Sequence, residues 1–156
     1  CMCYSGQCTL SAVLGGRSGN RGLCAQPCRL AYRWPGDRQT SHPLSLKDLS
    51  LAGHLGQLEE MGVACLKIEG RMKRPEYVAV VTAIYAAALR EHREPTRKEM
   101  AQLEAAFSRQ GFTQGYFLDR KGPAMFGTRP EGTRDPADLF AQAKQFYTGG
   151  STGPCR

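Results

Sequence analysis

The first 44 residues lack the regular spacing of apolar side chains that a helix or strand needs, and this absence most constrains the fold. They are rich in Gly, Arg, Ser and Pro and contain five of the seven cysteines. Few apolar residues are present to offset the entropy that is lost when such a segment becomes ordered. A bound metal that links the cysteines is the simplest way to hold it, because metal binding supplies folding free energy directly.

The cysteines favour thiolate chemistry over disulfides, because their number is odd and no secretory leader precedes them. A secreted, disulfide-stapled domain is the alternative. Cys1, Cys8, Cys24 and Cys28 form two pairs that together close one site with four sulfur ligands, and Cys3 competes for a ligand position. Four thiolates suit either a tetrahedral zinc ion or a four-iron cluster. The spacing favours the cluster, because zinc ribbons usually place two residues between paired cysteines.

The charge of the chain indicates an anionic partner. There are 21 Lys and Arg against 14 Asp and Glu, which gives a formal net charge of +7. Residues 1–36 contain Arg17, Arg21, Arg29 and Arg33 but no carboxylate. Nucleic acid is the commonest partner of such a surface, and a small anionic metabolite fits the same charge. The arginines also suit an anionic iron-sulfur cluster, whose potential responds to nearby charge.

Beyond residue 44 the sequence predicts helices that alternate with a strand. We expect a helix from a capping box at Ser45 to Met61, a buried strand over Val63–Ile68 that includes Cys65, a helix from Pro75, and a helix capped by Thr96 that ends at Phe107. Residues 109–129 predict turns and short strands. This alternation is typical of α/β architectures with a parallel sheet, and one strand cannot form a sheet alone. Because the chain also starts at a cysteine, we expect a fragment of a longer polypeptide.

A second polar cluster stands where the predicted strand ends and the next helix begins. Its sequence is Lys67-Ile68-Glu69-Gly70-Arg71-Met72-Lys73-Arg74. Ligand sites of α/β sheets lie at such carboxyl ends. The expected anion-binding residues are Arg17, Arg21, Lys67, Arg71, Lys73 and Arg74, and the catalytic candidates are Glu69 and Arg71. The alternative interpretation is a solvated charged turn.

Signatures of hydrolytic enzymes are missing from the sequence. There is no Gly-x-Ser-x-Gly or His-Glu-x-x-His motif, and the three histidines (His42, His54 and His92) are scattered. No apolar run is long enough to cross a bilayer. We expect a soluble, cytoplasmic protein without a membrane partner.

Several motifs together resemble the collagenase-like peptidases of family U32. They are Cys1-x4-Gly6-Gln-Cys8-Thr-Leu-Ser11, Gly15-Gly-Arg-Ser-Gly-Asn-Arg-Gly22, Cys24-Ala-Gln-Pro-Cys28-Arg29, Leu44-Ser-Leu-Lys-Asp-Leu49, Leu66-Lys-Ile-Glu-Gly-Arg-Met-Lys73, Gly111-Phe-Thr-Gln-Gly-Tyr116 and Met125-Phe-Gly-Thr-Arg129. The resemblance covers most of residues 1–129. The last motif most resembles the branch of the family that acts on ribosomal RNA.

This resemblance implies the C-terminal part of a TIM-barrel-like domain, whose N-terminal barrel half belongs to the same polypeptide and is absent here. It implies oxygen-independent hydroxylation of an rRNA or tRNA base, a 4Fe-4S cluster on Cys1, Cys8, Cys24 and Cys28, and prephenate as co-substrate. The fragment alone is then expected to be inactive. A collagenase-like peptidase and a zinc-stabilised RNA-binding module are the alternatives.

The domain organisation expected from the sequence has four parts. They are an iron-sulfur segment (1–44), a helix-strand-helix part of the barrel (45–95), a helical and Gly/aromatic extension (96–147) and a disordered tail (148–156).

Overall fold

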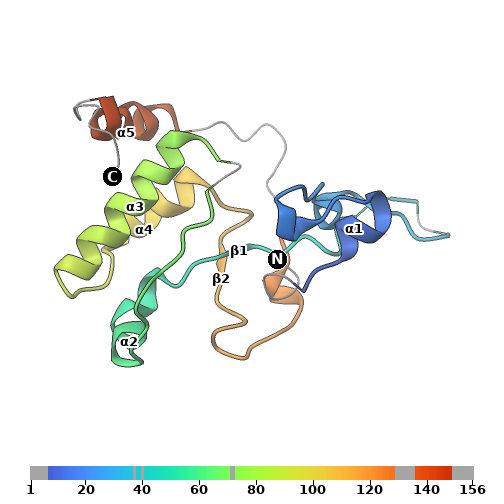
Figure 1. Ribbon diagram of the computed structural model, residues 1–156, viewed down its shortest axis with the longest axis horizontal. Helices are drawn as coiled ribbons and strands as arrows, with labels where there is room; N and C mark the ends of the chain where they lie inside the picture. Colours follow the sequence, from blue (N-terminus) through green and yellow to red (C-terminus); the bar gives the residue numbers. More distant parts are fainter. Residues whose placement is uncertain (1–6, 37, 40, 71–72, 129–135, 149–156) are drawn as a thin grey trace. The chain divides into compact units, whose positions relative to one another are not determined.

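A computed structural model describes residues 7–36, 38–39, 41–70, 73–128 and 136–148. The chain divides into two compact units, shown in Figure 1. Unit 1 comprises residues 1–49 and 109–130, and unit 2 comprises residues 50–108 and 131–156. Helices combine with a small parallel sheet, which confirms the α/β class in its coarse form.

Unit 2 is built from helices packed around one central helix. Its helices are α2 (Leu55–Glu60), α3 (Pro75–Arg90), α4 (Arg97–Ala106) and α5 (Ala137–Thr148), and a 3-10 turn η3 (Ala52–His54) precedes α2. The central helix α3 contacts the other three, and α3 and α4 lie side by side in Figure 1. The core of unit 2 therefore lies around α3.

Helix α3 forms where the sequence predicted it. Pro75 occupies the first turn, where its missing N–H costs nothing, and the helix continues to Arg90. Val80, Val81, Ile84 and Ala88 are buried at helical spacing. The prediction of an apolar face on this helix is confirmed.

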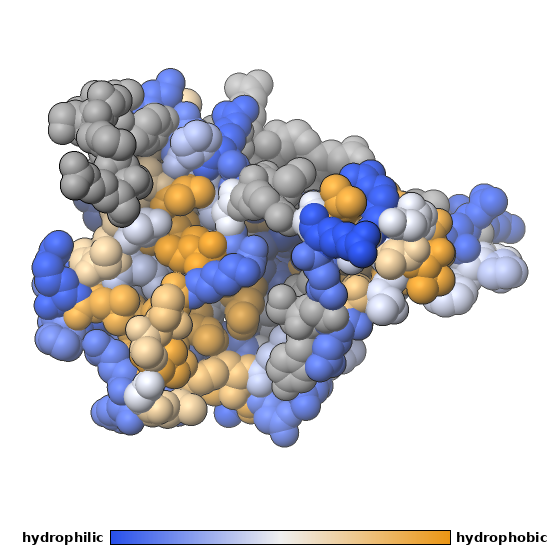
Figure 2. All heavy atoms as spheres, viewed as in Figure 1, coloured by the Kyte–Doolittle hydropathy of each residue, from blue (hydrophilic) through white to orange (hydrophobic). Residues whose placement is uncertain are grey.

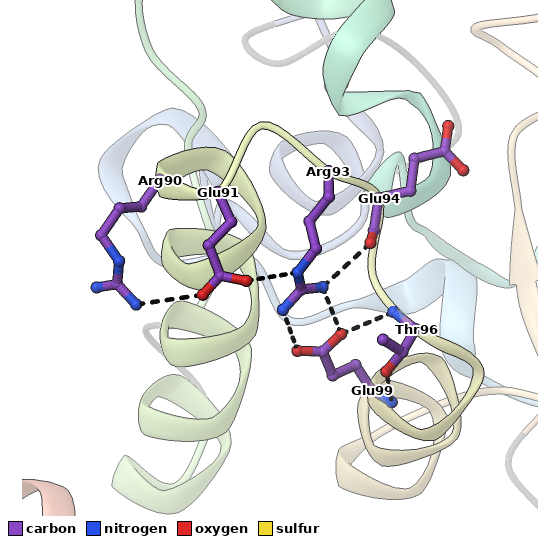
Figure 3. Close-up of polar contacts among 6 residues, drawn as sticks. All are labelled: Arg90, Glu91, Arg93, Glu94, Thr96 and Glu99. Carbon is purple, nitrogen blue, oxygen red and sulfur yellow. Dashed lines mark hydrogen bonds and ion pairs between the residues drawn. The ribbon is translucent and has the colours of Figure 1, made fainter.

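The connection between α3 and α4 is closed by a polar cluster, drawn in Figure 3. The Arg93 guanidinium donates to both carboxylate oxygens of Glu99 at 2.8 and 2.9 Å and to Glu91 at 2.6 Å. Thr96 and Glu99 form a capping box, in which the Thr96 hydroxyl accepts the Glu99 N–H and the Glu99 carboxylate accepts the Thr96 N–H. The predicted cap of this helix is confirmed.

The carboxylate of Glu99 makes the stability of unit 2 depend on pH. Hydrogen bonds from Arg93, and then from Thr96, lower its pKa from 4.5 to about 2. A lowered pKa in the folded state stabilises the fold fully above pH 4.5, and this contribution is lost as the pH falls towards 2. We expect Glu99→Gln to lower the thermal unfolding midpoint at neutral pH by a few degrees. Between pH 4.5 and 2, the midpoint of this variant should fall less than that of the wild-type protein.

Thermal unfolding followed by circular dichroism, at neutral pH and across the acid window, measures this effect. Glu104→Gln is the matched control, because Glu104 is an exposed carboxylate on the same helix. If acid lowers the unfolding midpoint by the same amount in the wild-type protein and in Glu99→Gln, Glu99 is not the source of the pH-dependent stability.

The helix predicted from Ser45 starts later than expected. Residues Asp48–Leu49 form a strand, β1, and helical structure begins only at η3 and α2. The reason is a non-local pairing: Ser45 and Lys47 hydrogen-bond to the backbone of Gly127 and Met125. The predicted end is confirmed, because Gly62 takes a left-handed φ of 75° and Val63 N–H bonds to Leu58 C=O.

The buried strand predicted over residues 63–68 is wrong. No strand is assigned there, and Val63, Ala64 and Cys65 are exposed, so Cys65 does not lie in the core. Within the described residues the named strands pair only with each other, which leaves this segment without a ladder. Figure 2 shows apolar side chains gathered on the surface of the unit that contains α2 and α3, where Met61, Val63 and Val78 are exposed.

Unit 1 consists mostly of turns held by a few pairings. Its elements are α1 (Leu10–Gly15), the 3-10 turns η1 (Gly19–Arg21), η2 (Pro27–Arg29) and η4 (Pro123–Met125), and the strands β1 (Asp48–Leu49) and β2 (Phe112–Thr113). The strands pair in parallel, with Asp48 opposite Phe112. Turns and a short strand lie over residues 109–128, which confirms the predicted turns and short strands for the described part of this segment. A barrel stays a prediction.

None of the described helices is both long and apolar enough to cross a membrane. Helix α5 extends to Thr148, where the predicted tail begins, and the rest of that tail lies outside the described residues.

Candidate functional site

A tight turn carries the second pair of cysteines in unit 1. Between Cys24 and Cys28, Gln26 takes a left-handed φ of 55°, which is unusual for a residue other than glycine. The Gln26 N–H donates to the Cys24 sulfur at 3.3 Å. Pro27 then opens the turn η2, which contains Cys28. Backbone outside the favoured regions persists where the surroundings enforce it, often at a functional site.

Cys8 belongs to the same neighbourhood through helix α1. The helix begins two residues after Cys8 and contacts η2, which carries Cys28. Ser11, which is 4% exposed, accepts the Ala25 N–H at 2.9 Å and so ties α1 to the residue that follows Cys24. The fold thus brings the segments of three of the four predicted ligands together.

The cysteines of this neighbourhood have the chemistry that a soft metal needs. Cys8, Cys24 and Cys28 are free thiols with at least partial exposure, and Cys1 lies outside the described residues. Cysteine binds a metal through its thiolate sulfur. Among the described residues, no three His, Cys, Asp or Glu side chains already form a group that holds a metal. The donor set fits a thiolate-bound metal, and the ligand assignment stays a prediction.

Arg29 connects this turn to two distant motifs. Its guanidinium donates to the Ser45 hydroxyl at 3.0 Å and to the buried Leu46 carbonyl. The Ser45 hydroxyl in turn donates to the Gly127 carbonyl at 2.9 Å. Burial, and then the charge of Arg109, lower the pKa of Arg29, while Cys28 and Asp48 act in the opposite direction. The residue after Cys28 is therefore fixed by a polar network.

Asp48 and Arg109 complete this network as an ion pair. Both side chains are largely buried, and among the described residues the second carboxylate oxygen of Asp48 has no hydrogen-bond partner. Gly127 is needed here for space, because a Cβ at this position would lie 2.6 Å from the Arg109 carbonyl oxygen and 2.9 Å from Lys47. Three motifs far apart in the sequence, at residues 24–29, 44–49 and 125–129, therefore meet around Arg29.

The other arginines of the first segment lie near its surface. Arg17 is exposed and donates to the Leu23 carbonyl at 2.8 Å, which closes the glycine-rich loop. Arg21 is exposed at the end of η1. Their predicted role in substrate binding stays a prediction.

The second predicted cluster lies in unit 2 and is only partly described. Lys67 and Glu69 form an ion pair at 2.9 Å, with side chains 79% and 78% exposed. Such a pair contributes little to stability. Arg71, the leading candidate for anion binding and catalysis, lies outside the described residues. Gly70 packs closely against α3, since a Cβ there would lie 2.8 Å from Val78.

Lys73 and Arg74 directly precede the first residue of α3, Pro75. The Lys73 ammonium lies 2.7 Å from the centroid of the Phe107 ring and 5.7 Å from that of Tyr77, as cation–π contacts. Arg74 occupies the N-cap position of α3. A nearby pocket of ≈ 220 Å³ is lined by residues of α2, by Leu89 and by residues 63–66, so it includes none of the predicted site residues.

Several residues of the site were not singled out from the sequence. Ser11, Gln26, Ser45, Asp48, Arg109 and Gly127 all act through contacts with residues far away in the chain or through an unusual backbone angle. Local spacing carries no signal for such contacts. Membership of the family-like motifs could have identified all of them except Arg109, which lies outside those motifs.

Comparison with known proteins decides the family. The sequence profile of Peptidase family U32 matches residues 1–126. The chain belongs to this family. Among its curated relatives, a 23S rRNA 5-hydroxycytidine synthase of Escherichia coli is 35% identical over 99% of this chain and 22% of the relative. The tRNA hydroxylation protein P of Helicobacter pylori is 34% identical over 77% of this chain and 32% of the relative.

The U32 family also includes relatives named for proteolysis. A collagenase of Porphyromonas gingivalis is 36% identical over 78% of this chain and 32% of the relative. The chain spans about a fifth to a third of the length of these curated relatives. No solved structure matches it.

Proposed function

We propose that this chain is the cysteine-bearing part of an RNA hydroxylase that contains a 4Fe-4S cluster and modifies a base of rRNA or tRNA. The observation that carries the proposal is the Cys24–Cys28 turn, in which an amide donates to sulfur and a left-handed Gln26 orients the segment. The names of two relatives, matched over 77% and 99% of this chain, support RNA as the substrate.

In this proposal Cys8, Cys24 and Cys28, together with Cys1, would hold the cluster. Sulfur ligands select zinc, copper(I) or iron-sulfur centres. A bound cluster would supply one-electron transfer, which thiols and arginines alone do not provide. Arg29 and the network around it would fix the Cys28 segment. Positively charged surroundings would favour an anionic iron-sulfur cluster.

The second cluster would bind the anionic groups of the reaction. Arg71, Lys73, Arg74 and Lys67 would hold RNA phosphate or the carboxylates of prephenate as co-substrate. In unit 1, Arg17 and Arg21 would bind substrate phosphate groups. Glu69 and Arg71 would orient the reacting groups. Because the chain spans only 22% and 32% of the length of these two relatives, we expect no turnover from these 156 residues alone.

The test compares RNA nucleosides by mass spectrometry between cells with and without the full-length gene. The expected result is the loss of one hydroxylated nucleoside in the deletion strain and its return on complementation. Unchanged RNA, together with cleavage of denatured collagen by the pure full-length protein, would overturn the proposal in favour of proteolysis.

The cluster is tested separately by anaerobic reconstitution with iron and sulfide. A coloured protein with about four iron atoms per chain is expected for a four-iron cluster. A colourless protein that holds one zinc ion would replace the cluster by a structural zinc site.

A further inference from the structure

The loop that follows the cysteine turn exposes the one tryptophan of the chain. Trp34 is 63% exposed, although a large aromatic side chain is usually mostly buried. Its neighbour Arg33 and the nearby Arg38 are also exposed. An exposed aromatic ring in an arginine-containing segment is typical of a binding surface rather than of a core.

This loop has a fixed base. Tyr32 and Ser41 exchange two backbone hydrogen bonds of 2.7 and 2.8 Å, which close the loop as an antiparallel bridge. The Tyr32 hydroxyl donates to the Pro27 carbonyl at 2.8 Å, next to Cys28. The base of the loop that carries Trp34 is therefore held to the turn that carries the candidate ligand.

The charge around the loop suits a polyanion. Residues 7–36 contain four arginines and no carboxylate, and Asp37 is the one acidic residue between Tyr32 and Ser41 in the sequence. Single-stranded nucleic acid is bound by aromatic side chains that stack on unpaired bases and by basic groups that hold the phosphates. Trp and Arg are also enriched at protein interfaces, so the feature that favours a polyanion here is the absence of carboxylates from residues 7–36.

We propose that Trp34, which follows Tyr32 of the Tyr32–Ser41 bridge, stacks on an unpaired base of single-stranded RNA, with Arg33 and Arg38 on the adjacent phosphates. This inference rests on the proposed function, because it takes RNA to be the substrate. It adds the place where the RNA strand is held: a loop whose base is hydrogen-bonded beside Cys28. A base read in this way must be unpaired, so the substrate site is a loop, bulge or end of the RNA.

Because Trp34 is the sole tryptophan, its fluorescence reports on this loop alone. We expect a single-stranded oligoribonucleotide to quench the emission of the 156-residue chain saturably, and a fully paired duplex of the same sequence to quench it much less. Anisotropy of a labelled oligonucleotide then compares variants. Trp34→Ala should weaken binding roughly 5- to 150-fold, the range for one lost stacking contact, and Trp34→Phe should restore most of it.

Two further variants separate stacking from charge and from general surface effects. Arg33→Gln should reduce the slope of log affinity against log salt by about 0.7, as expected for one lost phosphate contact with a single strand. Val13→Ala changes an equally exposed apolar side chain on α1 and should leave binding unchanged. Circular dichroism verifies that each variant is folded, which is expected because Trp34 and Val13 are both exposed.

The outcomes distinguish this inference from the proposed function. RNA binding without quenching, and with equal affinity in Trp34→Ala, would overturn the role of the loop while leaving RNA as the substrate. A blue shift of the emission with rising protein concentration, without an effect of RNA, would assign the loop to a protein contact and also overturn the inference. The loss of a hydroxylated nucleoside on gene deletion tests the proposed function independently of both.

Discussion

Cys24→Ser is expected to abolish formation of the proposed metal centre. The Cys24 sulfur receives the Gln26 N–H, so its position is fixed by the backbone of the turn that also carries Cys28. A serine hydroxyl does not provide the soft thiolate that an iron-sulfur cluster requires. After anaerobic reconstitution we expect iron and sulfide per chain to fall to near zero, together with the visible absorbance. Cys28→Ser should behave in the same way.

Cys65→Ser is the matched control for these variants. Cys65 is also a free and exposed thiol, but it belongs to unit 2 and to a segment without a predicted ligand. It should retain the full iron content of the wild-type chain. Equal iron content in Cys24→Ser and Cys65→Ser would contradict the assignment of Cys24 as a ligand.

Arg29→Met is expected to loosen unit 1 around the cysteine turn. Methionine keeps much of the side-chain stem but removes the donors to the Ser45 hydroxyl and the buried Leu46 carbonyl. Hydrogen bonds from a charged group contribute about 1.5–3 kcal/mol each, and an unsatisfied buried carbonyl adds a similar cost. Because Arg29 is only partly buried, water can replace part of these bonds, and the expected loss in the local stability of unit 1 is below their sum, roughly 2–3 kcal/mol.

Amide hydrogen exchange measures this loss where it should occur. The Lys47 N–H bonds to the Met125 carbonyl and the Gly127 N–H bonds to the Ser45 carbonyl, so both report on the network that Arg29 supports. Their exchange should become faster by one to two orders of magnitude, whereas exchange in α3 stays unchanged. Arg33→Met provides the comparison, because Arg33 is an exposed arginine of the same segment. Unchanged exchange at both amides would show that Arg29 does not hold the network.

The helices of unit 2 could be predicted because their signals are local. Pro75 and the apolar spacing of residues 80–88 define α3, and the Thr96–Glu99 capping box defines the start of α4. Each signal lies within one or two turns of the helix that it specifies. The structure confirms these elements with small shifts at their ends.

The errors arose where contacts distant in sequence decide the conformation. Ser45 has the local pattern of a helix cap, but its hydroxyl and backbone bond to Arg29 and Gly127 instead. The apolar run from Val63 has the pattern of a buried strand, yet a strand is stable only beside a partner. A pattern of residue types shows what a segment can form, while the partner decides what it does form.

The candidate site was predicted as a set of residue types more than as a geometry. The free thiols of Cys8, Cys24 and Cys28 lie on neighbouring segments, as their spacing suggested, and the ligand set itself stays a prediction. The four arginines of residues 1–36 were grouped by their charge alone, but Arg29 lies in a partly buried network while Arg17 and Arg21 are exposed. Residues of the same type can be either buried or exposed. The sequence therefore does not show which of these arginines is partly buried, and the structure does.

The division of unit 1 into two sequence segments sets the order in which its parts are made. The Ser45 hydroxyl and its acceptor on Gly127 are 82 residues apart, and residues 50–108 of the other unit are synthesised between them. On the ribosome, the cysteines emerge long before the strand and turn that complete their surroundings, and contacts of such large sequence separation form slowly. The thiols therefore lack these surroundings until translation has passed residue 127. If they hold the proposed cluster, the timing of metal delivery would be part of the biosynthesis of this protein.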